Sequence, residues 1–245
     1  MAYSEQRVLS KKNWSDNIFS FTTTRPEDFD FKNGEFVTLG LRPNKKLIPR
    51  AYSIVSSNQQ ESLEFLSIRV PDGPLTSHLS EVDSGSSIWI NQKSTGSLTL
   101  DHIKPGRHLF MIATGTGVAP FISLIRGAEA YQRFEKVILV HSVRTKSGLA
   151  FRNELESLSN QQFIYFPTVT RESFKYTARG SDLFCSGELS TILGIPELNP
   201  DLDRVMVCGN PNMNRDVKSF LLDHGWQMTN HQGVGNFTLE QAFVL

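Results

Sequence analysis

Hydrophobic and polar positions follow two different patterns in the two parts of the chain. In the first part, short apolar or alternating segments are separated by turn-rich stretches such as RPEDFDFKNG and RPNKKLIP. This pattern predicts strands in IFSFTTT, EFVTLGL, AYSIVSS, LEFLSIRV and SIWINQK, with PLTSHLSEV as the one expected short helix. Many short strands without long helical periods favour an antiparallel barrel or sandwich.

The pattern changes at HIKPGRH, and from there strands and helices alternate. The expected order is a strand in HLFMIA, a helix in VAPFISLIRGAEAYQRF, a strand in VILVH, a helix in GLAFRNELESL, and strands in FIYFPTV and RVMVC. The next helix should be capped by Asn210, begin at Pro211 and stop near Gly225. Alternation of this kind predicts an open parallel sheet, so we expect two domains, residues 1–104 and 105–245.

Composition narrows the classes of function. The chain has 245 residues, 39% of them hydrophobic, with 25 basic and 25 acidic residues. This balance gives no global charge that would favour nucleic acid or an anionic membrane. Two cysteines are too few for a disulfide framework or a cysteine-ligated iron–sulfur cluster, and no metal site is expected. Because neither an apolar leader nor a bilayer-spanning segment is found, the expected location is the cytoplasm.

The strand in PRAYSIVSSN carries side chains that are unusual for a core. Alternation along a strand places Arg50, Tyr52 and Ile54 on one face and Ala51, Ser53 and Val55 on the other. A cation and an aromatic ring then share one face. The pattern raises the question of which ligand needs a positive charge beside a ring.

Two glycine-containing loops follow expected parallel strands. In TGTGVAPF, Gly115 and Gly117 permit a tight turn, and the helix start presents free N–H groups to a phosphate. VCGNPNM follows another strand, and loops at the carboxyl ends of parallel strands form the ligand crevice. The alternative for the first loop is a glycine turn that merely joins strand to helix. The alternative for Cys208 is a small buried hydrophobic residue.

Three arginines follow the ends of expected strands in this part: Arg144, Arg171 and Arg179. The planar guanidinium group matches a pair of phosphate oxygens, and two arginines from neighbouring strand ends can clamp a dianion. Solvated surface arginines are the alternative. The grouping of all three after adjacent strand ends favours the clamp.

In combination, the motifs resemble those of the ferredoxin–NADP⁺ reductases, and of their bacterial branch in particular. RAYS (Arg50–Ser53), VPDGPLTSHL (Val70–Leu79), TGTGVAPF, VHSVR, PTVTRE and CGNPNM occur in the order seen in that family, and EQAFVL resembles the Ala-Phe-Val near the end of bacterial relatives. The resemblance covers nearly the whole chain. It implies an N-terminal antiparallel six-stranded Greek-key barrel that binds FAD, and a C-terminal Rossmann-like parallel α/β domain that binds NADP(H). It also implies a C-terminal tail that returns to the flavin.

The resemblance implies which residues bind FAD. Arg50 would pair with the pyrophosphate, Tyr52 would pack against the isoalloxazine ring, and Ser53 would hydrogen-bond beside flavin N5. A charge for phosphate and a ring for stacking agree with the strand pattern itself. Thr76 and Ser77 would receive the FAD phosphates, and helix capping is a coexisting role. The full expected FAD site comprises Arg50, Ala51, Tyr52, Ser53, Val70, Leu75, Thr76, Ser77, Thr116 and Phe243, the last of which resembles the aromatic on the FAD adenine.

For NADP(H), Gly115, Thr116 and Gly117 resemble the pyrophosphate loop. Arg144 and Arg171 resemble the clamp for the 2′-phosphate, which implies a preference for NADPH over NADH. The full expected NADP site comprises Gly115, Thr116, Gly117, Arg144, Arg171, Arg179, Cys208, Gly209 and Asn210. The expected catalytic residues are Ser53, Cys208 near the nicotinamide ring, and Ala242, which would face the flavin where plant enzymes have a tyrosine.

The implied activity is that of a ferredoxin/flavodoxin–NADP⁺ reductase, in which NADPH passes a hydride to flavin N5 and electrons then leave one at a time to ferredoxin or flavodoxin. These carriers are acidic, and Arg42, Lys45, Lys46 and Arg50 are candidates for a basic docking surface, with a solvated loop as the alternative for the two lysines. A monomer without nucleic-acid or membrane partners is expected. Three alternatives remain open: a related NAD(P)H-dependent reductase serving a cytochrome or oxygenase, a non-catalytic FAD-binding electron-transfer subunit, and a plain structural barrel with an attached α/β module.

Overall fold

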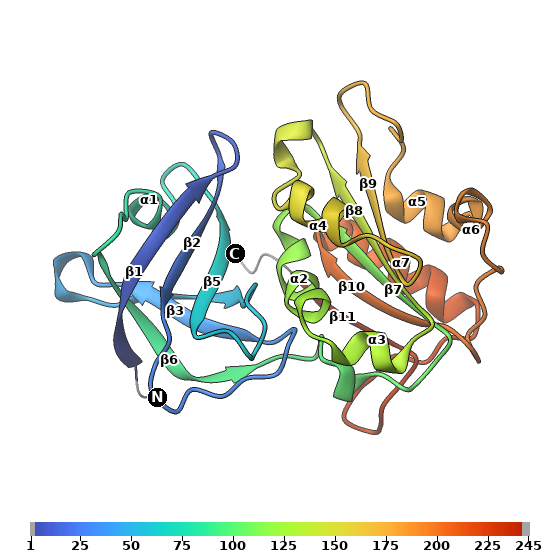
Figure 1. The fold of residues 1–245 in the computed structure, drawn as a ribbon, viewed down its shortest axis with the longest axis horizontal. Helices are drawn as coiled ribbons and strands as arrows, with labels where there is room; N and C mark the ends of the chain where they lie inside the picture. The colour runs from blue at the N-terminus through green and yellow to red at the C-terminus, as the bar shows by residue number, and fades with distance from the viewer. Residues whose placement is uncertain (1–2, 242–245) are drawn as a thin grey trace. The chain divides into compact units, whose positions relative to one another are not determined.

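The computed structural model describes residues 3–241, which form two compact units (Figure 1). The first unit contains the chain up to Gly96 together with Ala119–Gly127, and the second contains Ser97–Val118 and the chain from Ala128 onward. Lys104, after which the sequence predicts a domain boundary, lies within the second unit. No helix within residues 3–241 is long and apolar enough to cross a membrane.

Six antiparallel strands form the first unit. They are β1 (Tyr3–Asn13), β2 (Ile18–Thr24), β3 (Phe36–Leu41), β4 (Ile48–Ser53), β5 (Ser62–Ile68) and β6 (Ser87–Thr95), in the sheet order β4-β3-β6-β1-β2-β5. Just after β4, Ile54 forms a bridge with Phe65 of β5, and the N–H of Val55 donates to the carbonyl oxygen of Glu64 at 2.8 Å. These contacts join the two edge strands, so the sheet closes into the predicted barrel.

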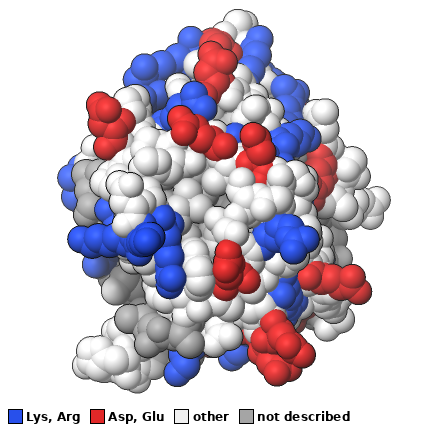
Figure 2. All heavy atoms as spheres, turned by 90° about the vertical axis from the view of Figure 1, so that its left-hand side faces the viewer, with Lys and Arg blue, Asp and Glu red and all other residues white. Residues whose placement is uncertain are grey.

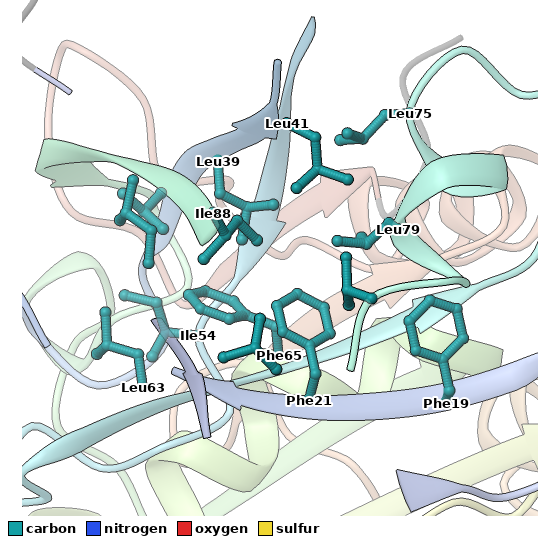
Figure 3. Close-up of a cluster of buried hydrophobic side chains, with 14 of the residues drawn as sticks. Phe19, Phe21, Leu39, Leu41, Ile54, Leu63, Phe65, Leu75, Leu79 and Ile88 are labelled. Carbon is teal, nitrogen blue, oxygen red and sulfur yellow. The ribbon is translucent and has the colours of Figure 1, made fainter. Parts of the chain in front are cut away.

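Apolar side chains from the strands fill the barrel interior (Figure 3). The rings of Phe21 and Phe65 lie 5.4 Å apart between centroids, a distance typical of packed aromatic pairs. The predicted short helix is α1 (Thr76–Leu79), and Leu75 and Leu79 from this segment are buried in the same cluster. Burial of these two leucines therefore fixes the position of the VPDGPLTSHL loop.

The sequence predicts one helix over VAPFISLIRGAEAYQRF, and this prediction is wrong. The segment forms two helices, α2 (Ala119–Arg126), which belongs to the first unit, and α3 (Glu129–Arg133), which belongs to the second. Gly127 separates them, and glycine is the poorest helix former after proline. A Cβ at this position would collide with the side-chain amide of Asn33, so the break also allows a close contact.

A five-stranded parallel sheet forms the second unit (Figure 1). Its strands are β7 (His108–Thr114), β8 (Lys136–Val143), β9 (Phe163–Val169), β10 (Arg204–Gly209) and β11 (Phe237–Gln241), in the order β11-β10-β7-β8-β9. The chain moves outward from β7 through β8 to β9, and β10 then pairs with the other side of β7. The sheet therefore has a topological switch point between β7 and β10, where ligands of such sheets usually bind. This arrangement confirms the predicted fold class.

The starting points of two helices in this unit have a clear structural cause. The helices of the unit include α4 (Arg152–Leu158), α5 (Gly180–Cys185), α6 (Glu188–Leu193) and α7 (Pro211–Asp223). The predicted helix over GLAFRNELESL begins only at Arg152, because Phe151 has a left-handed φ of 61°. The cap predicted for α7 is confirmed, since the Asn210 side chain accepts a hydrogen bond from the Asn212 N–H at 2.8 Å.

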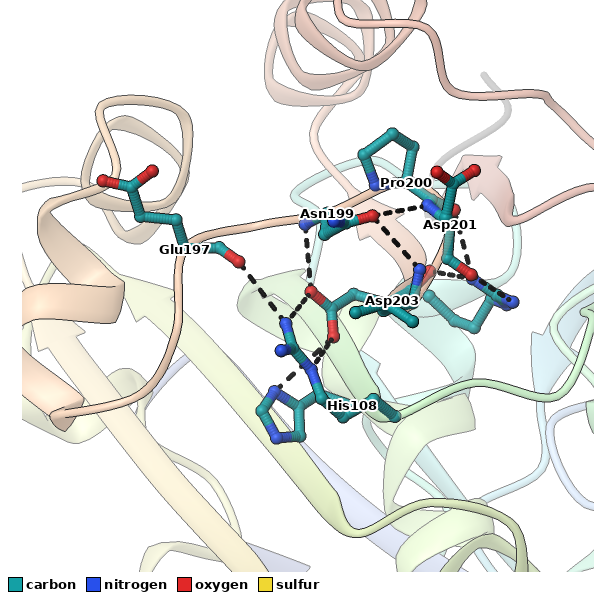
Figure 4. A network of polar contacts seen from close by, with 9 residues as sticks. His108, Glu197, Asn199, Pro200, Asp201 and Asp203 are labelled. Atoms are coloured by element: carbon teal, nitrogen blue, oxygen red, sulfur yellow. Dashed lines mark hydrogen bonds and ion pairs between the residues drawn. The ribbon is translucent and has the colours of Figure 1, made fainter.

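A buried polar network joins the starts of β7 and β10 (Figure 4). The fully buried carboxylate of Asp203 accepts hydrogen bonds from Arg107 at 3.0 and 2.7 Å and from the Asn199 N–H at 3.0 Å. His108 Nδ1 lies 3.5 Å from the same carboxylate, and burial lowers the pKa of this histidine. Because parallel strands all start at the same edge, this network lies at the opposite edge of the sheet from the loops that follow the strands.

Candidate functional site

The loops after β7 and β10 pack directly against each other. A Cβ on Gly117 would collide with the carbonyl oxygen of Cys208, and a Cβ on Gly209 would collide with the Thr114 hydroxyl. The Asn210 N–H donates to that hydroxyl at 2.8 Å. These two glycines are therefore required by the close approach of one backbone to the other. The two glycine loops of the sequence form one surface at the switch point of the sheet.

The exposed part of this surface is the turn η3 (Gly115–Val118). Gly115 has φ +55°, a left-handed conformation that favours glycine, and both Gly115 and Thr116 are half-buried. The first N–H groups of a helical turn have no partner within the turn. Free N–H groups and an absent side chain suit the close approach of a phosphate.

Two arginines meet at the ends of β8 and β9. The backbone N–H of Arg171 donates to the carbonyl oxygen of Arg144 at 2.9 Å, and both side chains are exposed. Within residues 3–241, neither guanidinium forms an ion pair. Two adjacent, unpaired cations at one end of a sheet have the chemistry of a dianion site.

The third predicted arginine, Arg179, is brought to the same strand ends by a polar contact. Arg179 directly precedes α5, whose first residue, Gly180, donates its N–H to Ser142 Oγ of β8 at 2.9 Å. Thr168 of β9 donates to the same oxygen at 2.9 Å. A side chain at position 180 would collide with Val140, so glycine allows the helix start to dock here. All three predicted arginines thus lie where β8 and β9 end.

Cys208 at the end of β10 is buried, with 2% of its surface exposed. Burial, and secondarily the charge of Glu240, raises the pKa of the Cys208 thiol well above its usual range. The side chain is therefore a neutral thiol rather than a thiolate nucleophile.

Glu240 is a further candidate residue beside this surface, and the sequence did not point to it. It lies opposite Cys208 in the register of β10 and β11, and it accepts hydrogen bonds from the N–H of Ser97 and, at 3.0 Å, from the Ser97 hydroxyl. Burial raises the pKa of this carboxyl group. The available signal was the single acidic residue in FTLEQAFVL. Perturbed carboxyl groups of this kind often mark functional sites.

In the first unit, β4 presents the residues predicted to hold FAD. Arg50 is exposed, and among residues 3–241 its guanidinium donates to one acceptor, the carbonyl oxygen of Pro49, at 2.8 Å. Ala51 is exposed, and Ser53 is half-buried with a hydroxyl that makes no hydrogen bond within residues 3–241. The cation and the hydroxyl are both available to a ligand.

Tyr52 is half-buried between these residues. Its ring packs edge-on against Phe65 at 6.5 Å and its hydroxyl lies 3.1 Å from the Ser67 hydroxyl, while burial raises the pKa of the phenol. The predicted alternation of faces ends with the strand at Ser53, because Ile54 and Val55 are both fully buried.

The VPDGPLTSHL loop folds back on itself. Thr76 Oγ1 lies 3.3 Å from both the N–H and the carbonyl oxygen of Val70, which is exposed. The hydroxyl and the N–H of Ser77 both donate to the carbonyl oxygen of Gly73, at 2.6 and 3.3 Å. Leu75 is buried in the barrel core, so only its backbone can contact a ligand. Of the remaining predicted residues, Ala242 and Phe243 lie outside the described part of the chain.

Family models match both units of the chain. Residues 5–99 match the model described as "Oxidoreductase FAD-binding domain", and residues 111–219 match the model described as "Oxidoreductase NAD-binding domain". These matches exclude a plain structural barrel with an attached module. The two cofactor-binding domains predicted from the sequence are thus both present.

Individual relatives agree with the family models. The chain is 44% identical over 250 residues to a ferredoxin–NADP reductase of Pseudomonas aeruginosa, covering 98% of this chain and 97% of that protein. It is 34% identical over 217 residues to a flavodoxin/ferredoxin–NADP reductase of Escherichia coli, covering 86% and 87%. A crystal structure of the ferredoxin NADP⁺ reductase of Neisseria gonorrhoeae with bound FAD and NADP is similar with a TM-score of 0.94 and 32% identity, covering 99% of this chain and all of that one. The chain belongs to the ferredoxin–NADP reductase family.

Proposed function

We propose that this protein is a flavoenzyme that moves electrons between NADPH and a one-electron carrier, ferredoxin or flavodoxin. The observation that carries the proposal is the adjacency of Arg144 and Arg171, exposed and unpaired among the described residues, at the edge of the sheet that also bears the glycine loops. This edge offers free N–H groups for a pyrophosphate and a paired cation site for the 2′-phosphate that distinguishes NADPH from NADH.

The proposed NADP(H) site uses the loops and strand ends of the second unit. Gly115, Thr116 and Gly117 bind the pyrophosphate, and Arg144 and Arg171 clamp the 2′-phosphate. The remaining proposed contacts are Arg179, Cys208, Gly209 and Asn210. Cys208 offers the nicotinamide an uncharged, polarizable side chain, because burial keeps its thiol protonated.

The proposed FAD site lies along β4 and the loop before α1. The exposed guanidinium of Arg50 binds the pyrophosphate, and Tyr52 packs against the ring system. The Ser53 hydroxyl, which makes no hydrogen bond within residues 3–241, donates a hydrogen bond beside N5. The remaining proposed contacts are Ala51, Val70, Leu75, Thr76, Ser77, Thr116 and Phe243. Leu75 contributes backbone only, and Ser77 binds phosphate by exchanging its hydrogen bonds to Gly73.

When bound, FAD accepts a hydride from NADPH and passes electrons on singly, and this is the chemistry that the chain has to support. Ser53 holds a hydrogen bond at the reacting nitrogen. Glu240, whose carboxyl pKa is raised by burial, lies opposite Cys208 and is proposed as a proton-exchanging group. Ala242 is proposed to leave the flavin accessible to the nicotinamide, because its side chain is small.

The proposed docking surface for the acidic carrier is the loop between β3 and β4. Arg42, Lys45 and Lys46 are exposed in this loop and Arg50 is exposed on β4, which follows it. The Arg42 guanidinium lies 3.5 Å from the centre of the Trp89 ring. Figure 2 shows basic and acidic side chains interspersed over one face of the molecule. A local basic loop, rather than a uniformly basic surface, is therefore the feature proposed to steer the carrier. The cytoplasmic location and the monomeric state expected from the sequence remain predictions.

The proposed function is tested by steady-state reduction of purified ferredoxin and flavodoxin with NADPH and with NADH. We expect NADPH to support reduction of at least one carrier, with a rate that falls as salt rises, while ferricyanide reduction stays nearly insensitive to salt. Efficient transfer from NADH to a cytochrome or oxygenase component, without transfer to either carrier, would instead favour the related reductase.

A further inference from the structure

His141 is a buried histidine that has no role in the function proposed above. It lies near the end of β8, on the strand next to the one that leads into the Gly115 turn, and its side chain is fully buried. Its Nε2 lies 3.0 Å from the carbonyl oxygen of Gly115, and its Nδ1 lies 3.1 Å from the hydroxyl of Tyr165 on β9. Both ring nitrogens therefore have a partner.

These two partners determine which nitrogen carries the proton. A carbonyl oxygen can only accept, so Nε2 must carry the hydrogen that reaches Gly115. In the neutral ring Nδ1 is then an acceptor, and the Tyr165 hydroxyl donates to it. Burial lowers the pKa of His141 to about 4, so the ring is neutral at physiological pH. Tyr165 is also buried, and its phenol pKa is raised, so the hydroxyl keeps its proton.

The bond to Gly115 sets the orientation of one peptide group in the proposed pyrophosphate loop. A trans peptide is planar, and its carbonyl and N–H point in opposite directions. Because the Gly115 carbonyl points toward the buried His141, the N–H of Thr116 points away from it. This N–H has no acceptor inside its own turn, and none outside it among residues 3–241. It is therefore directed away from the buried His141 and is available to an anion.

We propose that His141, held in one tautomer by Tyr165, is a positioning residue that orients the Gly115–Thr116 peptide toward the pyrophosphate of NADP(H). The inference rests on the proposed function of this loop. Gly115 needs such a support, since a glycine at φ +55° has more backbone freedom than any other residue. Orienting the donor in advance lowers the ordering cost of binding.

The test compares two ligands in variants of the FAD-loaded protein. NADP⁺ has the pyrophosphate, whereas adenosine 2′-monophosphate has only the 2′-phosphate. We expect His141→Leu to weaken NADP⁺ binding about tenfold, equivalent to one lost hydrogen bond, and to change binding of adenosine 2′-monophosphate less than about twofold. His141→Gln, whose amide can still donate to Gly115, should recover most of the NADP⁺ affinity. Flavin absorbance and melting temperature verify that each variant is folded.

Equal losses for both ligands, an unchanged NADP⁺ affinity in His141→Leu, or no recovery in His141→Gln would each overturn the proposal. If His141→Leu does not fold, Tyr165→Phe replaces it, because this change removes only the hydroxyl that holds the tautomer. A selective loss for NADP⁺ in Tyr165→Phe supports the inference, and a loss shared by both ligands contradicts it. Failure of the unaltered protein to bind NADP⁺ would contradict the proposed function instead.

Discussion

The backbone N–H of Arg171 donates to the carbonyl oxygen of Arg144 at 2.9 Å, although 26 residues separate them in the sequence. This bond lies just beyond the last register pair of β8 and β9, one residue after Val143 and two residues after Val169. The two guanidinium groups therefore start from neighbouring backbone positions on adjacent strands. Two arginines placed in this way can both contact one doubly charged phosphate, which is the basis of the proposed clamp.

Replacing Arg144 or Arg171 by alanine should weaken NADPH without weakening NADH. Each charge-assisted contact with the 2′-phosphate contributes about 1.5–3 kcal/mol, so the KM for NADPH should rise about tenfold to a hundredfold. NADH lacks the phosphate, and its kcat/KM should change little. The measurement is steady-state ferricyanide reduction with each nucleotide.

Lys136→Ala is the matched control for these variants. Lys136 is a cation at the opposite end of the same strand, where its Nζ donates to the carbonyl oxygen of Gln161. This variant should keep the preference for NADPH. If Arg144→Ala and Arg171→Ala lower kcat/KM for NADPH and for NADH equally, the proposal of a 2′-phosphate clamp is wrong.

Replacing Ser53 by alanine should slow flavin reduction while FAD remains bound. The Ser53 hydroxyl makes no hydrogen bond within residues 3–241, so its removal leaves no protein partner unpaired. Loss of one hydrogen bond at the reacting nitrogen should lower the single-turnover rate with NADPH about tenfold. Ser84→Ala, at an exposed turn of the same unit, serves as the control. Identical rates for Ser53→Ala and the unaltered protein would remove the proposed role of the hydroxyl.

Replacing Asp203 by alanine should destabilise the second unit without changing nucleotide affinity. Asp203 is fully buried and accepts two hydrogen bonds from Arg107, and breaking a buried pair of this kind typically costs about 3 kcal/mol or more. The network lies at the opposite edge of the sheet from the glycine loops, so NADP⁺ affinity should be kept. Urea unfolding measures the first effect and a binding titration the second.

Arg215→Ala is the control for that experiment, because its pair with Asp216 is exposed and should contribute less than about 1 kcal/mol. A free energy of unfolding that falls equally in the two variants would show that the buried network contributes no more than a surface ion pair.

His141 should make the folded state less stable in mild acid. Its pKa is about 4 when folded, against 6.5 for an ordinary histidine, so the unfolded chain binds the proton first. Stability from this group is complete above pH 6.5 and is lost as the pH falls toward 4, to a limit of about 3 kcal/mol. In His141→Gln the decline in the free energy of unfolding between pH 7 and pH 4.5 should be smaller. The same slope in both proteins would mean that His141 does not titrate in this way.

The motifs of the sequence predicted the local geometry around the proposed site, because each motif is local. The Gly115 turn, the Asn210 cap and the arginines after strand ends all follow from a few neighbouring residues and the direction of the chain. The strand β1 was not predicted, because Val8 is its only fully buried residue and most of its side chains are polar. Its position is set by pairing with β2 and β6, which a periodicity argument does not detect.

The same limit explains the residues that sequence analysis missed. His141 lies inside the apolar strand β8, and Glu240 lies near the end of β11. Their proposed roles depend on contact with Gly115 and on pairing opposite Cys208, both far away in the sequence. Leu75 shows the reverse case, since its motif predicted a ligand contact while its side chain fills the barrel core. For His141, Glu240 and Leu75 alike, the residues that determine the role of the side chain are distant in the sequence.

The most direct test of the account is anaerobic mixing of the purified, FAD-reconstituted protein with NADPH and, separately, with NADH, followed by addition of oxidised ferredoxin or flavodoxin. We expect rapid loss of the visible flavin absorbance with NADPH, a much slower loss with NADH at the same concentration, and recovery of the absorbance as the carrier is reduced. A protein that binds no flavin, or a bound flavin that stays oxidised in NADPH, would contradict it.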